Sequence, residues 1–139
     1  MKADEGPLLR PIGTVESSLR EKRDAPKQGE EGGPEAWLVF HAEYEEGLRD
    51  LEVGEEILLL TWLDRAERDV LSVHPRDDAR RPLRGVFSTR SADRPNPIGL
   101  HRVTVRAIEG TRLRVSDLEA LHGTPILDVK PVLDRVRER

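Results

Sequence analysis

The chain has 139 residues, of which 36% are charged and 36% hydrophobic, with a net charge of −4 and no cysteine. This composition predicts one domain, and the lack of cysteine excludes disulfides, thiolate metal sites and thiol nucleophiles. The sequence contains neither an apolar run of about 20 residues, which a membrane span needs, nor the apolar stretch of a signal peptide. We therefore expect a cytoplasmic protein that does not contact a membrane.

The charges are distributed unevenly along the chain. Residues 1–70 contain 9 basic and 18 acidic side chains, whereas residues 71–139 contain 14 basic and 9 acidic ones. This asymmetry indicates either an anionic ligand on the basic half or a solvated surface on which the signs compensate. The acidic total argues against general nucleic-acid binding, because non-specific affinity depends on the neutralisation of phosphates.

Strand patterns dominate the sequence from residue 11 onward. Apolar, β-branched and alternating residues predict strands at 11–17, 36–41, 55–63, 69–73, 85–90, 100–108, 113–115 and 126–129. Between the first two, the five Gly and Pro residues of 19–34 predict a long loop. Tyr44, Leu48 and Leu51 recur at i, i+4 and i+7, which predicts one short helix over 43–51. Glu109-Gly110 predicts a hairpin turn.

This order of elements favours a mainly β fold. No run of alternating strands and helices demands a parallel sheet, so we expect a small antiparallel β-barrel with one short helix and long loops, not a Rossmann fold. The whole chain is expected to form this single domain, with its core at about 11–132 and tails at 1–10 and 133–139. Trp37 and Trp62 lie in apolar strands, which favours packing in the core over stacking on bases.

The segment 85–100 is more polar than a simple strand connection, with the sequence GVFSTRSADRPNPIGL. Pro95 and Pro97 fix their own φ angles and keep the preceding residues extended, so we expect a stiff loop. Arg90 and Arg94 flank it, and Asn96 offers both hydrogen-bond donors and an acceptor. The segment is either a preorganised recognition loop or a stiff connection with solvated arginines.

A second polar segment, 121–131, has the sequence LHGTPILDVKP. Gly123 permits a tight turn or the close approach of a ligand, and Thr124 is held extended by Pro125. Asp128 and Lys130 fall on one face of the following strand. They either pair with each other at the surface, which would contribute about 0–1 kcal/mol, or face a ligand.

Together the two segments resemble the TsaA-like family, also called the YaeB or TrmO type. The family pattern is close to G-V-F-x-T-R-S-x-x-R-P-N-P-I-G-(L/M), followed after a hairpin by D-L-x-D-G-T-P-(V/I)-L-D-I-K-P-Y. Residues 85–100 match almost position for position, and Asp117-Leu118 and 123–131 match with Val129 in place of Ile. An uninterrupted R-P-N-P-I-G within this frame is a specific signal.

The resemblance implies an S-adenosylmethionine-dependent methyltransferase built on a β-barrel. Members of the family methylate N6 of threonylcarbamoyladenosine beside the tRNA anticodon, and they are homodimers with the cofactor near the subunit interface. By position, the cofactor-binding residues would be Pro26, Lys27, Gln28, Asp64, Arg65, Arg90, Leu100, His122, Gly123, Thr124 and Pro125. The substrate side would be formed by Arg94, Asn96, Asp128 and Lys130, with Asn96 and Asp128 as the catalytic candidates.

Several side chains have the chemistry to assist such a transfer. The N6 amine of adenine is a weak nucleophile, so a group that accepts its proton would help the reaction. Asp128 and His122 are the titratable candidates for this acceptor, and Asn96 would orient the amine. The threonyl carboxylate of the modified base needs a cation, which is available from Arg90, Arg94 and Lys130.

Departures from the family pattern leave other functions open: the extra C-terminal domain of longer members is not expected here, Asp64-Arg65 replaces the usual His-Gln, His122 replaces an acid, and Val132 replaces Tyr. The alternatives are methyl transfer to a small molecule or another nucleoside, and a non-catalytic S-adenosylmethionine-binding module. The basic run at 76–84 either guides RNA phosphates or is a solvated loop. The four histidines lack metal-ligand spacing, so we expect no metal.

Overall fold

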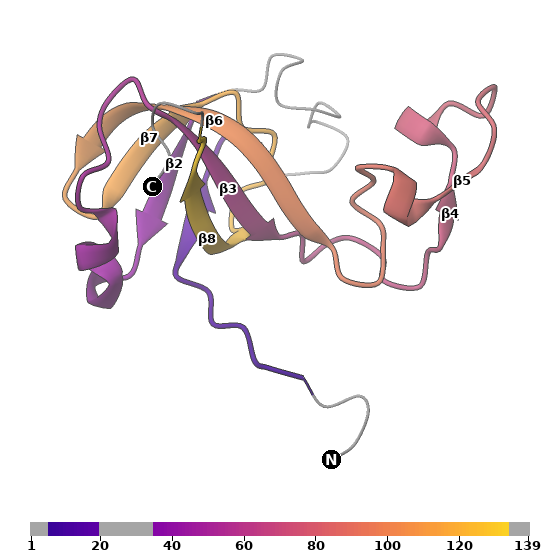
Figure 1. Ribbon diagram of the computed structural model, residues 1–139, viewed down its shortest axis with the longest axis horizontal. Coiled ribbons are helices and arrows are strands. Elements are labelled where there is room, and N and C mark those ends of the chain that lie inside the picture. The colour runs from indigo at the N-terminus through magenta and orange to yellow at the C-terminus, as the bar shows by residue number, and fades with distance from the viewer. Residues whose placement is uncertain (1–5, 20–34, 134–139) are drawn as a thin grey trace.

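Six antiparallel strands close into a barrel in the order β1-β2-β7-β6-β3-β8 (Figure 1). The computed structural model describes residues 6–19 and 35–133. The barrel strands are β1 (Gly13–Glu16), β2 (Ala36–Phe40), β3 (Glu56–Trp62), β6 (Ile98–Glu109), β7 (Arg112–Ser116) and β8 (Pro125–Pro131). The expected mainly β, non-Rossmann fold is confirmed, including the hairpin of β6 and β7.

The barrel is filled by one apolar face of each strand. Leu38 on β2, Ile57 and Leu59 on β3, Val103 on β6 and Leu113 on β7 are at most 1% exposed. Full burial of such a side chain contributes about 1.5–3 kcal/mol, so these alternating positions supply most of the stability. Strand β3 differs because three of its outward residues, Leu58, Leu60 and Trp62, are apolar as well.

A short 3-10 helix and two register shifts complete the barrel, one of them between β6 and β7 at Val105/Ala107. The helix η3 (Ala42–Leu48) lies where the sequence predicts one, and Leu48 and Leu51 pack against the core. The pairing of β3 with β8 shifts register between Leu60 and Thr61, so that Asp128 pairs with Leu60 and Ile126 with Thr61. In the described ranges, no helix is long and apolar enough to cross a membrane.

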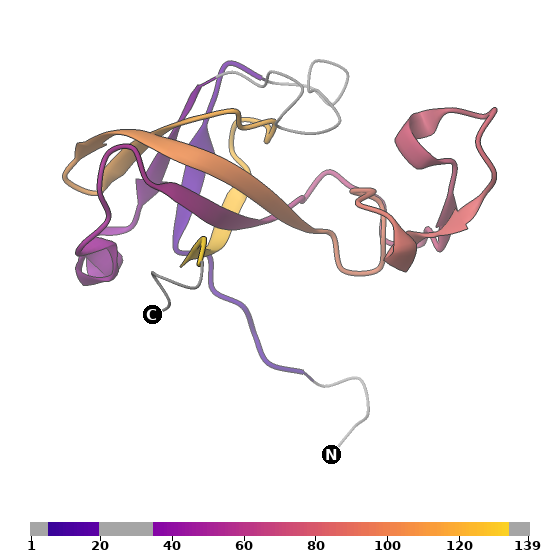
Figure 2. The same ribbon diagram turned by 45° about the horizontal axis from the view of Figure 1, so that its top comes forward.

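Residues 64–97, which we call the arm, leave the barrel between β3 and β6 and extend to one side of it. Both ribbon views show the arm standing away from the barrel (Figures 1 and 2). It contains the two-stranded sheet of β4 (Ser72–Val73) and β5 (Arg84–Gly85). It also contains the 3-10 turns η4 (Pro75–Asp77) and η5 (Val86–Ser88).

The strand predicted at 85–90 is wrong. Only Gly85 belongs to a strand, and the chain then turns through η5. The turn forms because the backbone carbonyls of this segment converge on the guanidinium of Arg94. A strand would point those carbonyls alternately in opposite directions, which is incompatible with a shared partner.

Candidate functional site

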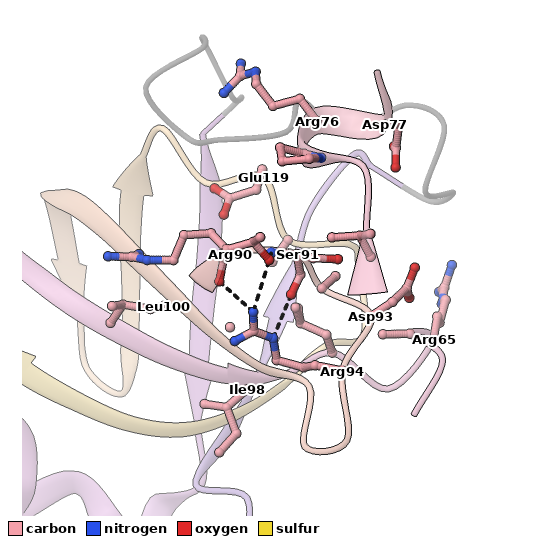
Figure 3. Close-up of a pocket in the computed structure, with 18 of the residues that line it drawn as sticks. Arg65, Arg76, Asp77, Arg90, Ser91, Asp93, Arg94, Ile98, Leu100 and Glu119 are labelled. Atoms are coloured by element: carbon pink, nitrogen blue, oxygen red, sulfur yellow. Dashed lines mark hydrogen bonds between the residues drawn. The ribbon is translucent and has the colours of Figure 1, made fainter. Parts of the chain in front are cut away.

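A cavity of about 840 Å³ lies between the open end of the barrel and the arm. Its lining comes from six stretches of the chain: 63–66, 73–77, 81–84 without residue 83, 88–94, 98–101, and 119–124 without 122 and 123. Figure 3 shows side chains from the barrel and the arm converging on this space. The cavity therefore depends on the position of the arm as much as on the barrel.

Arg94 holds the cavity wall formed by the arm. Its Nε donates to the carbonyl of Ser91 at 2.8 Å, and its Nη2 donates to the carbonyls of Thr89, at 2.6 Å, and Val86. Figure 3 draws the bond from Arg94 to Ser91 as a dashed line. A guanidinium presents several donors in a fixed plane, so one side chain can fix three carbonyls. Arg94 is thus turned toward its own loop, although it also lines the cavity.

The base of the arm is closed by contacts between 67–68 and 93–96. Asp93 Oδ1 accepts from the backbone N–H of Glu67 at 2.9 Å. Arg68 donates to the carbonyl of Pro95 at 2.6 Å and to Asn96 Oδ1 at 3.0 Å. Its guanidinium also lies 5.1 Å from the ring centroid of Trp62, a cation–π contact. Asn96 is exposed and lies outside the cavity lining.

Arg90 is the cation that this loop presents to the cavity. It is exposed and lines the cavity, and it has no hydrogen-bond or ion-pair partner among the residues that the structure describes. In Figure 3 its guanidinium extends toward Leu100. Arg65 lines the same cavity and donates to the carbonyl of His122 at 3.3 Å. Asp64 is a neighbouring carboxylate of the lining.

The turn 121–124 fixes the floor of the cavity to β1. His122 Nδ1 accepts from the backbone N–H of Ser17 at 3.2 Å, and the N–H of Gly123 donates to the carbonyl of Val15 at 2.8 Å. Gly123 has a φ of 88°, which a side chain would make unfavourable. Thr124 is buried and lines the cavity. His122, Gly123 and Pro125 do not line it.

Asp128 and Lys130 lie on the outer face of the barrel. The extra residue that the register shift inserts into β8 at Leu127 turns both side chains outward. The Lys130 Nζ lies 3.3 Å from Asp128 Oδ2. Neither residue lines the 840 Å³ cavity; Asp128 lies instead at a second cavity, of about 530 Å³, beside η3.

The basic run of the arm is partly neutralised by its own carboxylates. Arg80 donates to both carboxylate oxygens of Asp78, at 3.0 and 3.1 Å, and Arg81 lies 3.9 Å from the same group. These hydrogen bonds from Arg80 hold the pKa of Asp78 below its ordinary value. Because Arg80 is engaged and almost fully exposed, the geometry favours a solvated loop at this point.

Sequence reasoning missed three polar residues of the barrel interior: Thr61, His101 and Glu119. Thr61 and His101 are buried, and His101 and Glu119 line the cavity. The sequence signal that could have identified two of them is the alternation of inward and outward residues along a strand. Thr61 continues the inward face of Ile57 and Leu59, and His101 precedes Val103 on the inward face of β6. No group of three or more potential metal ligands occurs within 6–19 and 35–133.

The predicted site residues thus fall into three groups. Asp64, Arg65, Arg90, Arg94, Leu100 and Thr124 line one cavity. Asn96, His122, Gly123, Pro125, Asp128 and Lys130 lie outside its lining. Pro26, Lys27 and Gln28 lie outside the described residues.

Comparisons with known proteins give a consistent picture. The model of the tRNA-methyltransferase O N-terminal domain matches residues 14–137. An S-adenosyl-L-methionine-binding protein of Archaeoglobus fulgidus is 41% identical over 94% of this chain and 95% of its own length. A probable S-adenosyl-L-methionine-binding protein of Methanothermobacter thermautotrophicus is 42% identical over 92% of this chain and 91% of its own.

Solved structures of longer proteins also match this chain. The crystal structure of TrmO from Pseudomonas aeruginosa superimposes with a TM-score of 0.74 at 30% identity, over 93% of this chain and 57% of that one. Another TrmO crystal structure gives a TM-score of 0.75 at 32% identity, over 93% of this chain and 58% of that one. The chain therefore spans less than two thirds of the solved proteins that it resembles.

Proposed function

Because the chain belongs to the tRNA-methyltransferase O N-terminal domain family, we propose that it is an S-adenosylmethionine-dependent methyltransferase acting on tRNA. The cavity between barrel and arm would hold the cofactor. We further propose N6 of threonylcarbamoyladenosine beside the anticodon as the methyl acceptor, since the family resemblance of 85–100 and 123–131 implies it.

The observation that carries this proposal is the convergence of separated residues on one cavity. Asp64-Arg65, Arg90, Leu100 and Thr124 come from separate stretches of the sequence, yet all of them line the same space. A volume of about 840 Å³ is within the usual range for sites that enclose small molecules, roughly 300–1,000 Å³. The lining offers guanidinium, carboxylate, hydroxyl and apolar groups, which suits a ligand with both a nucleoside and an amino-acid end.

The residues of this chain would contribute chiefly by positioning. When bound, S-adenosylmethionine supplies an electrophilic methyl group on a sulfonium centre. Methyl transfer then needs little covalent help, so the alignment of acceptor and methyl group dominates the rate. Arg94 fixes the loop that presents Arg90, and the guanidinium of Arg90 is available for a carboxylate of the cofactor or of the modified base.

We also propose that the protein acts as a homodimer through the outer face of β3 and β6. This face carries the apolar side chains of Leu58, Leu60 and Trp62, beside Ile98 and Leu100, which are 42% and 43% exposed. Such a contiguous apolar surface is typical of an interaction site. Because Ile98 and Leu100 also line the cavity, a second copy packed on this face would cover the cavity mouth.

The catalytic assignments of Asn96 and Asp128 depend on this dimer. In one subunit both residues lie outside the cavity lining, and Asp128 is paired with Lys130. Asp128 neighbours Leu60 on the outer face of the barrel, at the border of the proposed interface. We propose that Asp128, Lys130 and Asn96 act on the substrate bound to the partner subunit.

A second candidate is a module that binds S-adenosylmethionine without turnover. It is favoured by the relative of matching length from Archaeoglobus fulgidus, whose name describes binding alone. The two functions differ in product formation. Saturable cofactor binding with no methyl transfer to any tRNA would support this candidate over the methyltransferase.

The proposed methyl transfer can be tested with isotopically labelled S-adenosylmethionine. We expect label to appear in tRNA that carries threonylcarbamoyladenosine and not in the same tRNA transcribed without modifications. Arg90→Ala should lower transfer at least tenfold, because a charge-assisted contact contributes about 1.5–3 kcal/mol. The matched control is Arg106→Ala, because Arg106 is an exposed arginine of β6 that lies outside the cavity lining. This variant should retain activity.

Label in both tRNAs would contradict the proposed acceptor, and label in neither would contradict the proposed methyl transfer to tRNA. Equal loss in Arg90→Ala and Arg106→Ala would contradict the assignment of the cavity.

The dimer is tested separately by sedimentation of the wild type and Leu60→Asp. We expect a dimer that the aspartate converts to monomers, because a carboxylate buried in an apolar interface is strongly unfavourable.

A further inference from the structure

A polar network is buried in the barrel wall that faces the cavity. His101 on β6 lies between Thr61 on β3 and Glu119, which follows β7. The His101 Nε2 is 2.7 Å from Thr61 Oγ1, and its Nδ1 is 2.5 Å from Glu119 Oε1. The side chains of His101 and Glu119 are only 3% and 18% exposed. Because a carboxylate oxygen can only accept, Nδ1 carries a proton, while Nε2 and the threonine hydroxyl share the second hydrogen bond of the ring.

The packing around this network fixes the orientation of the imidazole. A Cβ at Gly99 would collide with Thr61 Oγ1 and come within 2.7 Å of His101 Nε2. The absence of a side chain at Gly99 is therefore what lets the threonine and the imidazole meet. With its ring held from both sides, His101 in turn fixes one oxygen of Glu119.

The second oxygen of that carboxylate has no partner in the part of the chain that the structure describes. Glu119 Oε2 is shielded from solvent and makes no hydrogen bond to any residue within 6–19 and 35–133. Leaving a buried acceptor unsatisfied costs about 1–3 kcal/mol, and more when the acceptor is charged. A hydrogen-bond donor on a bound ligand would satisfy this oxygen. Glu119 lines the cavity in which such a ligand would bind.

A cation without a partner lines the same cavity. Arg90 has no hydrogen-bond or ion-pair partner among the described residues, and Figure 3 shows Arg90 and Glu119 on adjoining parts of the cavity wall. One unsatisfied carboxylate oxygen and one unpaired guanidinium match the two charges of an α-amino acid. The guanidinium suits its carboxylate and the carboxylate suits its ammonium group.

We propose that Glu119 accepts a hydrogen bond from the ammonium group of S-adenosylmethionine, and that His101 and Thr61 are the positioning residues that hold it. The inference rests on the proposed function, because it takes the cofactor to be bound in this cavity. The terminal torsion of a glutamate is broad, so a small rotation turns Oε2 into the cavity. A charged N–H donor then satisfies the oxygen that the fold leaves unpaired.

The test compares two ligands that differ in the amino-acid end. S-Adenosylhomocysteine carries the ammonium group, and 5′-deoxy-5′-methylthioadenosine has the same nucleoside thioether without it. Calorimetric titration of Glu119→Gln should show at least a tenfold loss of affinity for the first ligand and less than a threefold change for the second. The glutamine keeps the size of the side chain but offers an amide N–H where the ligand needs an acceptor.

Three results would overturn the assignment. Unchanged affinity of Glu119→Gln for both ligands would remove Glu119 from the site. An equal loss for both would assign its partner to the nucleoside. Equal affinity of the wild type for both ligands would mean that the ammonium group is not recognised. Failure of the wild type to bind S-adenosylmethionine or either probe would contradict the proposed function, whereas the first three results leave cofactor binding intact.

The positioning role of His101 has its own control. In His101→Asn the amide nitrogen replaces Nδ1 as the donor to Glu119, and in His101→Leu no donor remains. We expect His101→Asn to keep affinity for S-adenosylhomocysteine within threefold of the wild type and His101→Leu to lose it at least tenfold, although both truncate the ring. Thermal unfolding monitors the fold of each variant. Equal affinities of the two variants would contradict the positioning role.

Discussion

The barrel and the arm are held together by different interactions. Apart from Thr61, His101 and Glu119, the barrel interior is apolar, and the inward side chains of β2, β3, β6 and β7 are almost completely buried. In the arm, three large apolar side chains, Leu71, Leu83 and Phe87, are 61–79% exposed, and the chain is shaped by polar side chains bound to backbone carbonyls. Stability thus comes from the barrel, whereas the shape of the cavity depends on a few arginines of the arm.

This difference predicts that a truncation in the barrel destabilises the whole molecule. Leu59→Ala should lower the free energy of unfolding by about 2–5 kcal/mol, because it removes a fully buried side chain and leaves a void. Urea unfolding followed by tryptophan fluorescence measures the change. Leu83→Ala in the arm, where the side chain is 61% exposed, is the control and should stay within about 0.5 kcal/mol of the wild type.

Gly99 belongs to the barrel but borders the cavity, so its replacement should affect both. Gly99→Ala drives a methyl group into Thr61 and His101, both buried, and should cost about 1–3 kcal/mol of stability. The imidazole signal in NMR should shift, because the Thr61–His101 hydrogen bond is displaced. A variant with wild-type stability and an unshifted imidazole would show that this region of the barrel is looser than the structure indicates.

Loss of Arg94 should affect the arm and leave the barrel folded. Arg94→Met removes the donors to three carbonyls, so we expect rapid proteolysis between 85 and 95 and at least a tenfold loss of affinity for S-adenosylhomocysteine. The free energy of global unfolding should change by less than about 1 kcal/mol, because the arm opens locally. Arg94→Lys should behave alike, since an ammonium cannot reproduce the planar set of donors. If either variant destabilised the whole chain cooperatively, the result would contradict the view that the barrel supplies the stability and the arm only shapes the cavity.

The smallest change in stability is expected from the loss of one exposed ion pair in each region. Arg102 donates to Glu56 on the barrel surface at 3.0 and 3.1 Å and lowers the pKa of Glu56, as Arg80 does for Asp78 in the arm. A lowered folded-state pKa stabilises the protein above the ordinary carboxyl pKa of about 4.3, and this contribution is lost as the pH falls through the lowered value.

The two pairs should therefore respond differently to acid. Arg102→Gln should lower the melting temperature slightly at pH 7, and the difference from the wild type should vanish at pH 3. Arg80→Gln should leave the melting temperature unchanged at either pH, because the arm does not carry global stability. A difference for Arg102→Gln that persists at pH 3 would show that the effect is not electrostatic.

The same contrast explains what the sequence alone could predict. The barrel strands were predicted because period-2 alternation reports directly which face is buried, as in Val103 and Val105. The strand predicted at 85–90 failed because η5 depends on Arg94, whose contacts with its own loop leave no periodic signal. The family motif correctly indicated that Arg90 and Leu100 line a common cavity. It could not indicate that the side chain of Asp128 points outward, because this orientation depends on a register shift that no local sequence pattern encodes.

The missed network has a similar cause. Thr61 and His101 occupy inward positions in apolar strands, and a polar residue there is detectable from the period. Glu119 lies after the left-handed residue Asp117, whose φ is 62°, and beyond β7. Its approach to His101 is therefore set by the path of the chain after the strand and not by spacing along it.

Hydrogen–deuterium exchange with and without S-adenosylmethionine tests the division between a stabilising barrel and a ligand-binding arm. We predict slower exchange on binding in segments 63–66, 86–94 and 119–124, which border or shape the cavity, with β2 and β7 unchanged. Slower exchange around η3 and the second cavity instead, or no change at a saturating concentration, would contradict the assignment of the cofactor to the space between barrel and arm.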